Sequence, residues 1–337
     1  MSEPSDELRA AYRAALAAYL DSGDEQHREA AFSAGRQAFA DGMPLLSLVN
    51  LHRQTVTSLL VERGGQQGPD ETSAGFEFLT EALATFEMTQ RGYSEAQERA
   101  RWEREQSLRL QRNLLPSALP DVDGLDIAVR YLPGETGSDA GGDWYDVIRL
   151  GHDQVALVVG DVSGHGVAAA AAMGQLRIAV LAYAVARYQP AGVIAQVDEL
   201  LQWLATGDIA TLVYVVVDPI GNRMTVVNAG HPPPLLLRPD GSVRLVKEGH
   251  ARLVGVHPPL LQREQRVLDL ERGSRLLLFT DGLIEPLERA GEDGLQRLLA
   301  VTEGFAGSAD ELCDHVLAEL TPDGAHDDIC VVSATFT

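Results

Sequence analysis

The stretch Val158–Ala172, VVGDVSGHGVAAAAA, carries an apolar run directly into an aspartate and then into an alanine-rich segment. The apolar run predicts a strand that ends near Asp161, and the alanines predict a helix that follows it. Gly164 and Gly166 lie between the two and allow a tight turn. An aspartate is unfavourable in a strand, and a carboxylate at a sheet edge is usually a helix cap or a ligand. The choice between cap and ligand decides what this chain does.

Three further aspartates have the same setting as Asp161. Asp143 opens an apolar segment after two glycines, Asp281 closes the run RLLLFT, and Asp327 opens the run DICVVSATF. Taken alone, each is as readily explained as a turn residue, a cap or a solvated acid. If the strands are neighbours, however, four carboxylates converge and repel one another unless cations are present. Two divalent cations balance the four charges, and ligation by oxygen alone favours Mn²⁺ or Mg²⁺.

Composition excludes several classes of function. The net charge of −22 at pH 7 disfavours nucleic acid and anionic membranes as partners. The single lysine, Lys247, lies outside every setting in which a phosphate loop or a kinase uses this residue. The two cysteines, Cys313 and Cys330, are too few for a disulfide framework and fit the reducing cytoplasm. The acidic N-terminus and the short apolar runs predict neither a signal peptide nor a membrane span.

Residues 1–78 predict a bundle of short amphipathic helices. Leu8, Tyr12, Leu16 and Tyr19 recur on one helical face, and two further amphipathic segments follow before a polar loop over residues 65–75. This part contains no catalytic cluster, so we expect a bundle that buries one face against a partner and self-associates.

Residues 79–119 predict a linker helix. Leu79, Phe86 and Tyr93 begin a seam with a seven-residue period, which Ser107 interrupts. Two alternatives stay open: a parallel coiled coil in a homodimer, or a single helix packed on its own domain. Polar positions make such a seam weak enough to be switched.

Residues 120–337 predict an α+β domain with antiparallel sheets. Strands follow one another in hairpin-like succession, and a regular βαβ alternation is missing. The predicted strands are 125–132, 143–150, 154–161, 211–218, 223–230, 233–239, 274–282 and 327–336, and the predicted helices are 165–189, 191–207, 292–304 and 308–320.

An ordered set of motifs in this domain resembles the metal-dependent protein phosphatases (PPM), specifically their bacterial RsbU/SpoIIE branch. The motifs are ETGSDAGGDWYD, GDVSGHG, NAGHPPPLLL, FTDGLIE and DDICVV, and the preceding segment LQRNLLPSALP is also typical of that branch. Residues 1–80 are more loosely similar to the helical activator-binding domain of RsbU-type phosphatases. The resemblance implies an α-β-β-α sandwich with two metal ions in a cleft at one end.

The resemblance also implies roles for individual residues. Asp161 would bridge the two ions, and the Val162 carbonyl would bind one of them. Asp281 and Asp327 would hold the other ion, with Asp143 near the site. A water bound between the ions would attack phosphorus, which makes Asp161 and Asp143 the expected catalytic residues of a serine/threonine phosphatase.

The implied substrate is a phosphorylated STAS-domain anti-sigma-factor antagonist, in sigma-factor regulation of a stress or developmental response.

Two residues depart from the pattern of related sequences, and a third is not expected to take part in catalysis. His165 lies too far from Asp161 for the general-acid role known in eukaryotic members, and Arg130 lies thirteen residues before Asp143, where those members place an arginine closer. His231 is interpreted as a hairpin-turn residue with Asn228. The alternative function is a catalytically silent adaptor that keeps the fold.

Overall fold

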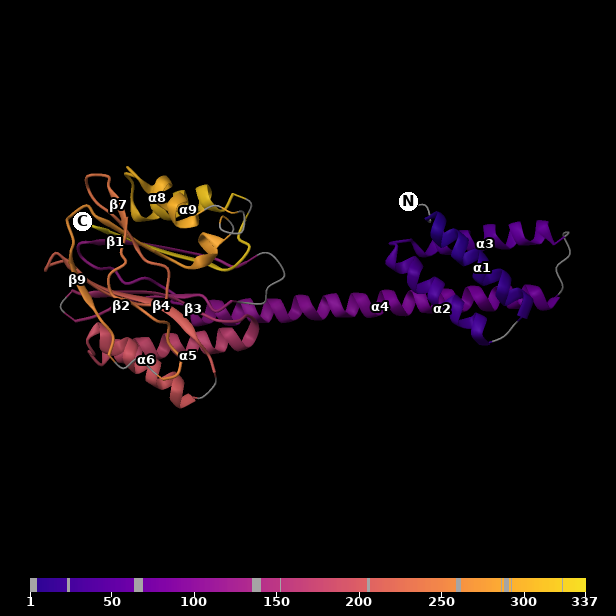
Figure 1. The fold of residues 1–337 in the computed structure, drawn as a ribbon, viewed down its shortest axis with the longest axis horizontal. Helices are drawn as coiled ribbons and strands as arrows, with labels where there is room; N and C mark the ends of the chain where they lie inside the picture. The colour runs from indigo at the N-terminus through magenta and orange to yellow at the C-terminus, as the bar shows by residue number, and fades with distance from the viewer. Residues whose placement is uncertain are drawn as a thin grey trace. The chain divides into compact units, whose positions relative to one another are not determined.

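The computed structural model describes the chain except residues 1–4, 23–24, 64–68, 135–140, 152, 205–206, 259–261, 286, 288–290, 292 and 323. It contains two compact units, Met1–Trp102 and Glu103–Thr337 (Figure 1). Composition places divisions at residues 78 and 119, whereas contacts place one division within a single helix, α4 (Pro69–Leu114).

The N-terminal unit is helical, as the sequence predicts. It consists of α1 (Asp6–Ser22), α2 (Glu25–Ala40), α3 (Leu45–Glu62) and the first part of α4. Tyr12 and Leu16 of α1 are fully buried, and the Tyr12 ring packs edge-on against Phe78 of α4 with centroids 5.4 Å apart. Burial of one apolar face per helix holds these short helices together.

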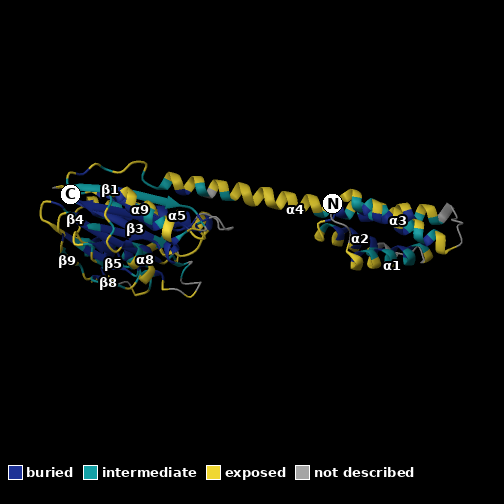
Figure 2. Cartoon of the chain, turned by 90° about the horizontal axis from the view of Figure 1, so that it is seen from above, coloured by how far each residue is buried: buried dark blue, intermediate teal, exposed yellow. Residues whose placement is uncertain are grey.

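Helix α4 begins ten residues before the predicted start at Leu79. The segment interpreted as a polar loop is helical from Pro69, because proline is well tolerated in a first helical turn. Phe78, Ala82 and Phe86 are buried, so this part of α4 is the fourth helix of the bundle. Residues 90–103 are exposed throughout (Figure 2), and the helix ends at Leu114, two residues before Pro116.

The C-terminal unit contains two sheets that pack face to face. The first has the strand order β1-β11-β10-β6-β7, and the second has the order β2-β3-β4-β5-β8, with β9 paired to β5. The strands of the first sheet are β1 (Leu125–Leu132), β6 (Leu235–Leu237), β7 (Val243–Leu245), β10 (Arg275–Phe279) and β11 (Ile329–Phe336). Those of the second are β2 (Trp144–Arg149), β3 (Val155–Val162), β4 (Ala210–Asp218), β5 (Arg223–Ala229), β8 (His250–Ala251) and β9 (Arg266–Asp269).

Helices cover the outer face of each sheet (Figure 1). The first sheet carries α8 (Gly294–Thr302) and α9 (Ala309–Leu320), and the second carries α5 (Gly166–Val185) and α6 (Pro190–Leu204). Leu157, Leu278 and Val332 belong to the apolar core between the sheets. The predicted α-β-β-α sandwich is confirmed.

The sequence did not predict β7, β8 or β9. These strands are two to four residues long, which is too short for a period in the sequence to be recognised. β8 also pairs parallel to β5, whereas the sequence predicts antiparallel sheets only.

Among the described residues, α5 is the one helix long and apolar enough to cross a membrane. Half of its apolar window is buried, and Met173 and Leu176 pack in the core beneath the second sheet. Its composition is therefore accounted for by packing on the sheet.

Candidate functional site

Strand ends from both sheets carry the four predicted aspartates to one end of the sandwich. In the second sheet, Asp143 precedes β2 and Asp161 lies near the end of β3, and the register pairs Trp144 with Gly160. In the first sheet, Asp281 follows β10 and Asp327 precedes β11. Antiparallel pairing of these neighbouring strands brings each pair of acids to the same edge.

Mutual repulsion shows that the acids from the two sheets lie close together. Burial raises the pKa of Asp143 well above its usual range, and the charge of Asp161 raises it further. The pKa of Asp161 is raised to about 7. Burial is the largest cause, and the negative charge of Asp281 from the other sheet is the second. Burial, then Glu285 and Asp327, raise the pKa of Asp281. These carboxylates destabilise one another in the absence of positive charge.

The carboxylate oxygens that the structure describes at this end of the sandwich suit divalent cations, although they are not arranged as a preformed metal site. Among the described residues, no three or more His, Cys, Asp or Glu side chains converge on a point as preformed ligands. Asp143 is nevertheless buried, and its Oδ2 has no hydrogen-bond partner within the described structure. An unpartnered buried carboxylate oxygen is costly, and a metal ion would satisfy it.

Glycines let the backbone segments of the site approach closely. A Cβ on Gly142 would lie 2.1 Å from the Val162 carbonyl oxygen, and the Val162 amide donates to the Gly142 carbonyl at 3.2 Å. Gly164 and Gly166 have φ of 104° and 84°, which side chains rarely permit. The turn after Asp161 therefore depends on glycine, as the sequence predicts.

His231 joins the two sheets behind the acids. Its Nδ1 lies 2.9 Å from Thr211 Oγ1 of β4, and its Nε2 lies 3.1 Å from the Phe279 carbonyl of β10. The carbonyl can only accept, so Nε2 carries the proton and Nδ1 accepts from Thr211. Burial lowers the pKa of His231 to about 3, which keeps the ring neutral. Asn228 also hydrogen-bonds the His231 backbone, donating to its carbonyl at 2.9 Å and accepting from its amide at 2.8 Å. The predicted hairpin turn is wrong, because β5 before the turn belongs to the second sheet and β6 after it belongs to the first.

Arg130 and His165 are the two residues that depart from the pattern of related sequences. Arg130 forms ion pairs with Asp310 and Asp314 of α9, at 2.9 and 2.8 Å. It is therefore engaged on the outer helix rather than placed to bind phosphate. His165 is exposed at the N-cap position of α5 and has no side-chain cap bond.

Sequence reasoning missed the neighbour of Asp327. Asp327 is exposed, and its Oδ1 accepts from the Asp328 amide at 2.7 Å. Asp328 is buried and accepts hydrogen bonds from the Gly134 and Gly141 amides at 2.9 and 3.1 Å. The two adjacent aspartates in DDICVV could have indicated that Asp328 also has a role, but the sequence does not show which of the two carboxylates faces inward.

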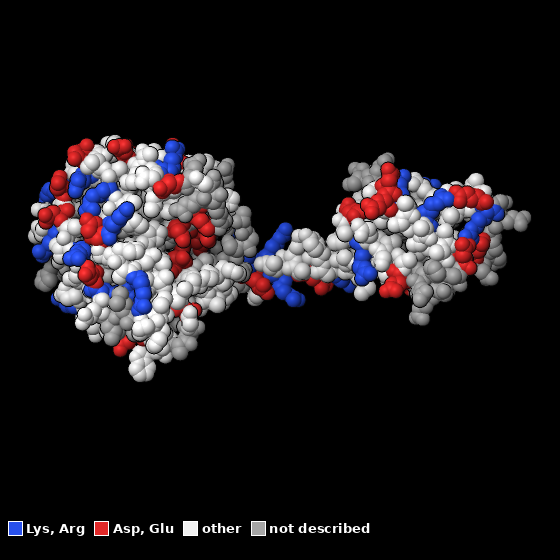
Figure 3. Space-filling model, viewed as in Figure 1, with Lys and Arg blue, Asp and Glu red and all other residues white. Residues whose placement is uncertain are grey.

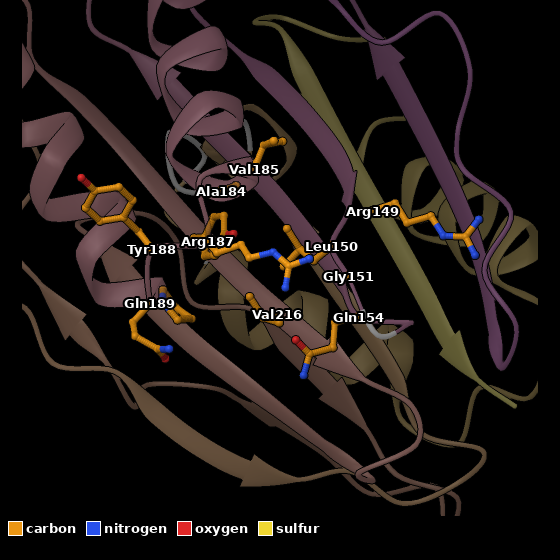
Figure 4. Close-up of a pocket in the computed structure, with 12 residues that line it drawn as sticks. Arg149, Leu150, Gly151, Gln154, Ala184, Val185, Arg187, Tyr188, Gln189 and Val216 are labelled. Carbon is orange, nitrogen blue, oxygen red and sulfur yellow. The ribbon is translucent and has the colours of Figure 1, made fainter.

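The C-terminal unit also has a group of acidic side chains on its surface (Figure 3) and a separate cavity. On the face drawn in Figure 3, acidic and basic side chains are scattered over the C-terminal unit, and one group of acidic side chains lies close together. Such a group attracts cations. A cavity of about 440 Å³ lies at the other end of β2 and β3, where Arg187 and Tyr188 line it (Figure 4). Strands rise about 3.3 Å per residue, so about 17 Å of β2 separates it from the carboxylates. It is not part of the candidate site.

Two family profiles match the chain. The profile described as "Stage II sporulation protein E (SpoIIE)" matches residues 151–337, and that of "Phosphoserine phosphatase RsbU, N-terminal domain" matches residues 10–89. Asp161, Asp281 and Asp327 lie within the first match, whereas Asp143 precedes it.

Individual proteins give the same result. "Phosphoserine phosphatase RsbU" of Bacillus subtilis (strain 168) is 22% identical over 331 residues, which is 95% of each chain. "Protein IcfG" of Synechocystis sp. is 30% identical over 250 residues, 65% of this chain and 38% of its own length. The crystal structure of the RsbU and RsbW domains of Rv1364c from Mycobacterium tuberculosis is 33% identical with a TM-score of 0.58, over 66% of this chain and 62% of that one. The chain thus spans less than two thirds of IcfG and of the Rv1364c chain, but nearly all of RsbU.

Proposed function

The chain belongs to the SpoIIE family of PP2C-type phosphatases, and we propose from this premise that it hydrolyses phosphoserine or phosphothreonine in a protein. The observation that carries the proposal is that aspartates from both sheets gather at one end of the sandwich, close enough that neighbouring carboxylates raise the pKa of Asp143, Asp161 and Asp281. A structural role would not gather unpaired acids, because their repulsion costs stability.

Two divalent ions, Mn²⁺ or Mg²⁺, fit this set of oxygens. Asp143, Asp161 and the Val162 carbonyl would hold them from the second sheet, and Asp281 and Asp327 from the first. When bound, such ions lower the pKa of a water and offset the charge on phosphoryl oxygens. Asp161 and Asp143 are the proposed catalytic residues, because Asp161 lies on β3 and Asp143 directly precedes its paired strand β2.

Other side chains hold these acids in place. A hydrogen bond from the Thr280 side chain favours the ionised form of Asp143 and partly opposes the effect of burial. Thr280 also accepts from the Cys330 amide at 2.8 Å, which joins the ends of β10 and β11. Thr280 of the first sheet thus helps to fix Asp143 of the second, and a preorganised catalytic site requires such support.

The proposed substrate is a phosphorylated STAS-domain anti-sigma-factor antagonist. Its support is the match of the N-terminal unit to the RsbU N-terminal domain and the match of nearly the whole chain to RsbU. Removal of phosphate would let the antagonist sequester its anti-sigma factor. The same proposal places the enzyme in the cytoplasm, where its two buried cysteines remain thiols.

We expect phosphate release from at least one phosphorylated STAS-domain protein of the same organism in the presence of Mn²⁺. The kcat/KM should exceed that for a short phosphoserine peptide by about 10-fold or more, because remote contacts contribute to catalysis. Chelation with EDTA should stop the reaction, and added Mn²⁺ should restore it. Binding of the STAS proteins without phosphate release would instead identify a silent adaptor.

The N-terminal unit and α4 are the proposed regulatory part, which receives an activator protein and forms a homodimer. In support, α4 exposes Met88, Tyr93 and Trp102, at 75%, 57% and 63%. Apolar side chains exposed along one helix favour a partner helix.

Removal of residues 1–102 is expected to leave a monomer with basal Mn²⁺-dependent activity, because Glu103–Thr337 forms a compact unit by itself. The full chain should sediment as a dimer, and analytical ultracentrifugation of both proteins tests this difference. A truncated protein that still sediments as a dimer would contradict the assignment.

A further inference from the structure

A side chain of the long helix α4 contacts segments directly beside the candidate site. Gln111 belongs to the last turn of α4 and is only 1% exposed. Its Nε2 donates to Asp328 Oδ2 at 2.6 Å and to the Gly141 carbonyl at 3.1 Å. It also contacts the Tyr131 hydroxyl of β1. The amide thus joins segments that are up to 217 residues apart in sequence.

Asp328 is the centre of this contact. Its Oδ1 accepts from the Gly134 amide at 2.9 Å, and its Oδ2 accepts from the Gly141 amide at 3.1 Å and from the Tyr131 hydroxyl. Both oxygens are therefore occupied by donors from the protein. This arrangement gives Asp328 a structural role, in contrast to its exposed neighbour Asp327.

The two partners of Gln111 lie next to proposed metal ligands. Asp328 directly follows Asp327, and Gly141 lies two residues before Asp143. The fit at Gly141 is close, because a Cβ there would lie 2.6 Å from Asp328 Oδ2. Fixing Asp328 against Gly141 therefore fixes the spacing between the segments that carry Asp327 and Asp143.

A second residue of α4 strengthens the connection. Arg104 donates to the Gly134 carbonyl at 2.9 Å, and the amide of Gly134 bonds Asp328. Arg104 and Gln111 are seven residues apart, so they lie on the same face of α4. The last three turns of α4 thus contact the segments beside the site through one face.

We propose that Gln111 is a positioning residue, whose amide holds Asp328 and the Gly141 carbonyl and so sets the distance between the Asp327 and Asp143 carboxylates. The inference rests on the proposed function, because it takes Asp143 and Asp327 as metal ligands. The hydrogen bonds of Gln111 are present whatever the function is. Groups that orient metal ligands typically change metal affinity or activity by about 10- to 100-fold when they are lost.

Gln111→Met in the full chain tests the inference. Methionine keeps the length and helix propensity of glutamine but cannot donate a hydrogen bond. We expect Mn²⁺ binding, measured by calorimetry without substrate, to weaken by about 10-fold or more. The Mn²⁺ concentration for half-maximal phosphate release should rise by a similar factor, while the rate at saturating Mn²⁺ changes much less. Lower stability alone would reduce the active fraction without moving either constant.

Gln106→Met is the matched control, because it makes the same change at an exposed position of α4 and should leave both constants unchanged. If Gln111→Met does not fold, Asp328→Asn tests the same contact from the other side and should weaken Mn²⁺ binding. Wild-type Mn²⁺ constants in the folded variant would overturn the inference. A wild-type protein that binds Mn²⁺ more tightly than Gln111→Met yet releases no phosphate would refute the proposed function and leave the inference standing.

Discussion

Asp161→Asn is expected to lower kcat/KM for a phosphoserine protein by about 10³-fold, which corresponds to about 4 kcal/mol of transition-state stabilisation. Asparagine has nearly the same shape as aspartate but lacks the charge that would hold divalent ions. Asp161 lies on β3, which is paired with β4, and it is close to Asp143 of its own sheet and Asp281 of the other. Phosphate release over a range of Mn²⁺ concentrations measures the effect.

The stability of this variant should move in the opposite direction. Removing one of several mutually repelling carboxylates relieves unfavourable charge, so the Tm of the metal-free variant should equal or exceed that of the wild type. Asp121→Asn changes an exposed aspartate before β1 and serves as the control, with unchanged activity expected. Retention of more than about a tenth of the activity in Asp161→Asn would exclude a central metal-binding role for this residue.

Arg263→Met is expected to destabilise the C-terminal unit by about 3–5 kcal/mol. The Arg263 guanidinium lies 2.8 Å from the Asp198 carboxylate of α6, and both side chains are 0% exposed. Asp198 also accepts from the Gly255 amide at 2.9 Å, and Arg263 donates to the Arg252 carbonyl at 2.8 Å. Loss of the cation leaves a buried carboxylate without its counter-charge, which is among the most costly single changes.

Urea unfolding of the full chain measures this effect against two comparisons. Arg266→Met removes an exposed pair with Glu264 and should cost less than about 0.5 kcal/mol. The double variant Arg263→Met/Asp198→Leu should be more stable than Arg263→Met alone, because it removes the stranded charge as well. A double variant less stable than the single one would show that the loss comes from packing.

Much of the fold follows from local patterns. The apolar runs locate eight strands of the sandwich, and the glycines after Asp161 locate the turn into α5. The errors also have local causes. Proline was interpreted as part of a loop at residue 69, where it begins a helix, and strands as short as β8 carry too few residues to show a period.

The candidate site could be predicted from local sequence patterns only in part. Four acids at strand ends predicted a shared edge, and the structure brings them near one another, while their role as metal ligands stays a prediction. Arg130 lies thirteen residues before Asp143, farther than the arginine of eukaryotic members, and the ion pairs of its side chain with Asp310 and Asp314 of α9 agree with this departure.

The sequence by itself determined the family, the class of fold and the acids available for chemistry, because periodicity and short motifs are properties of neighbouring residues. Only the tertiary structure decided that Asp328 faces inward while Asp327 remains exposed, and that Gln111, 217 residues earlier in the chain, donates a hydrogen bond to Asp328. The physical reason is that such contacts depend on how β1 and β11 pair and on where α4 ends against them, and no local pattern encodes these distances.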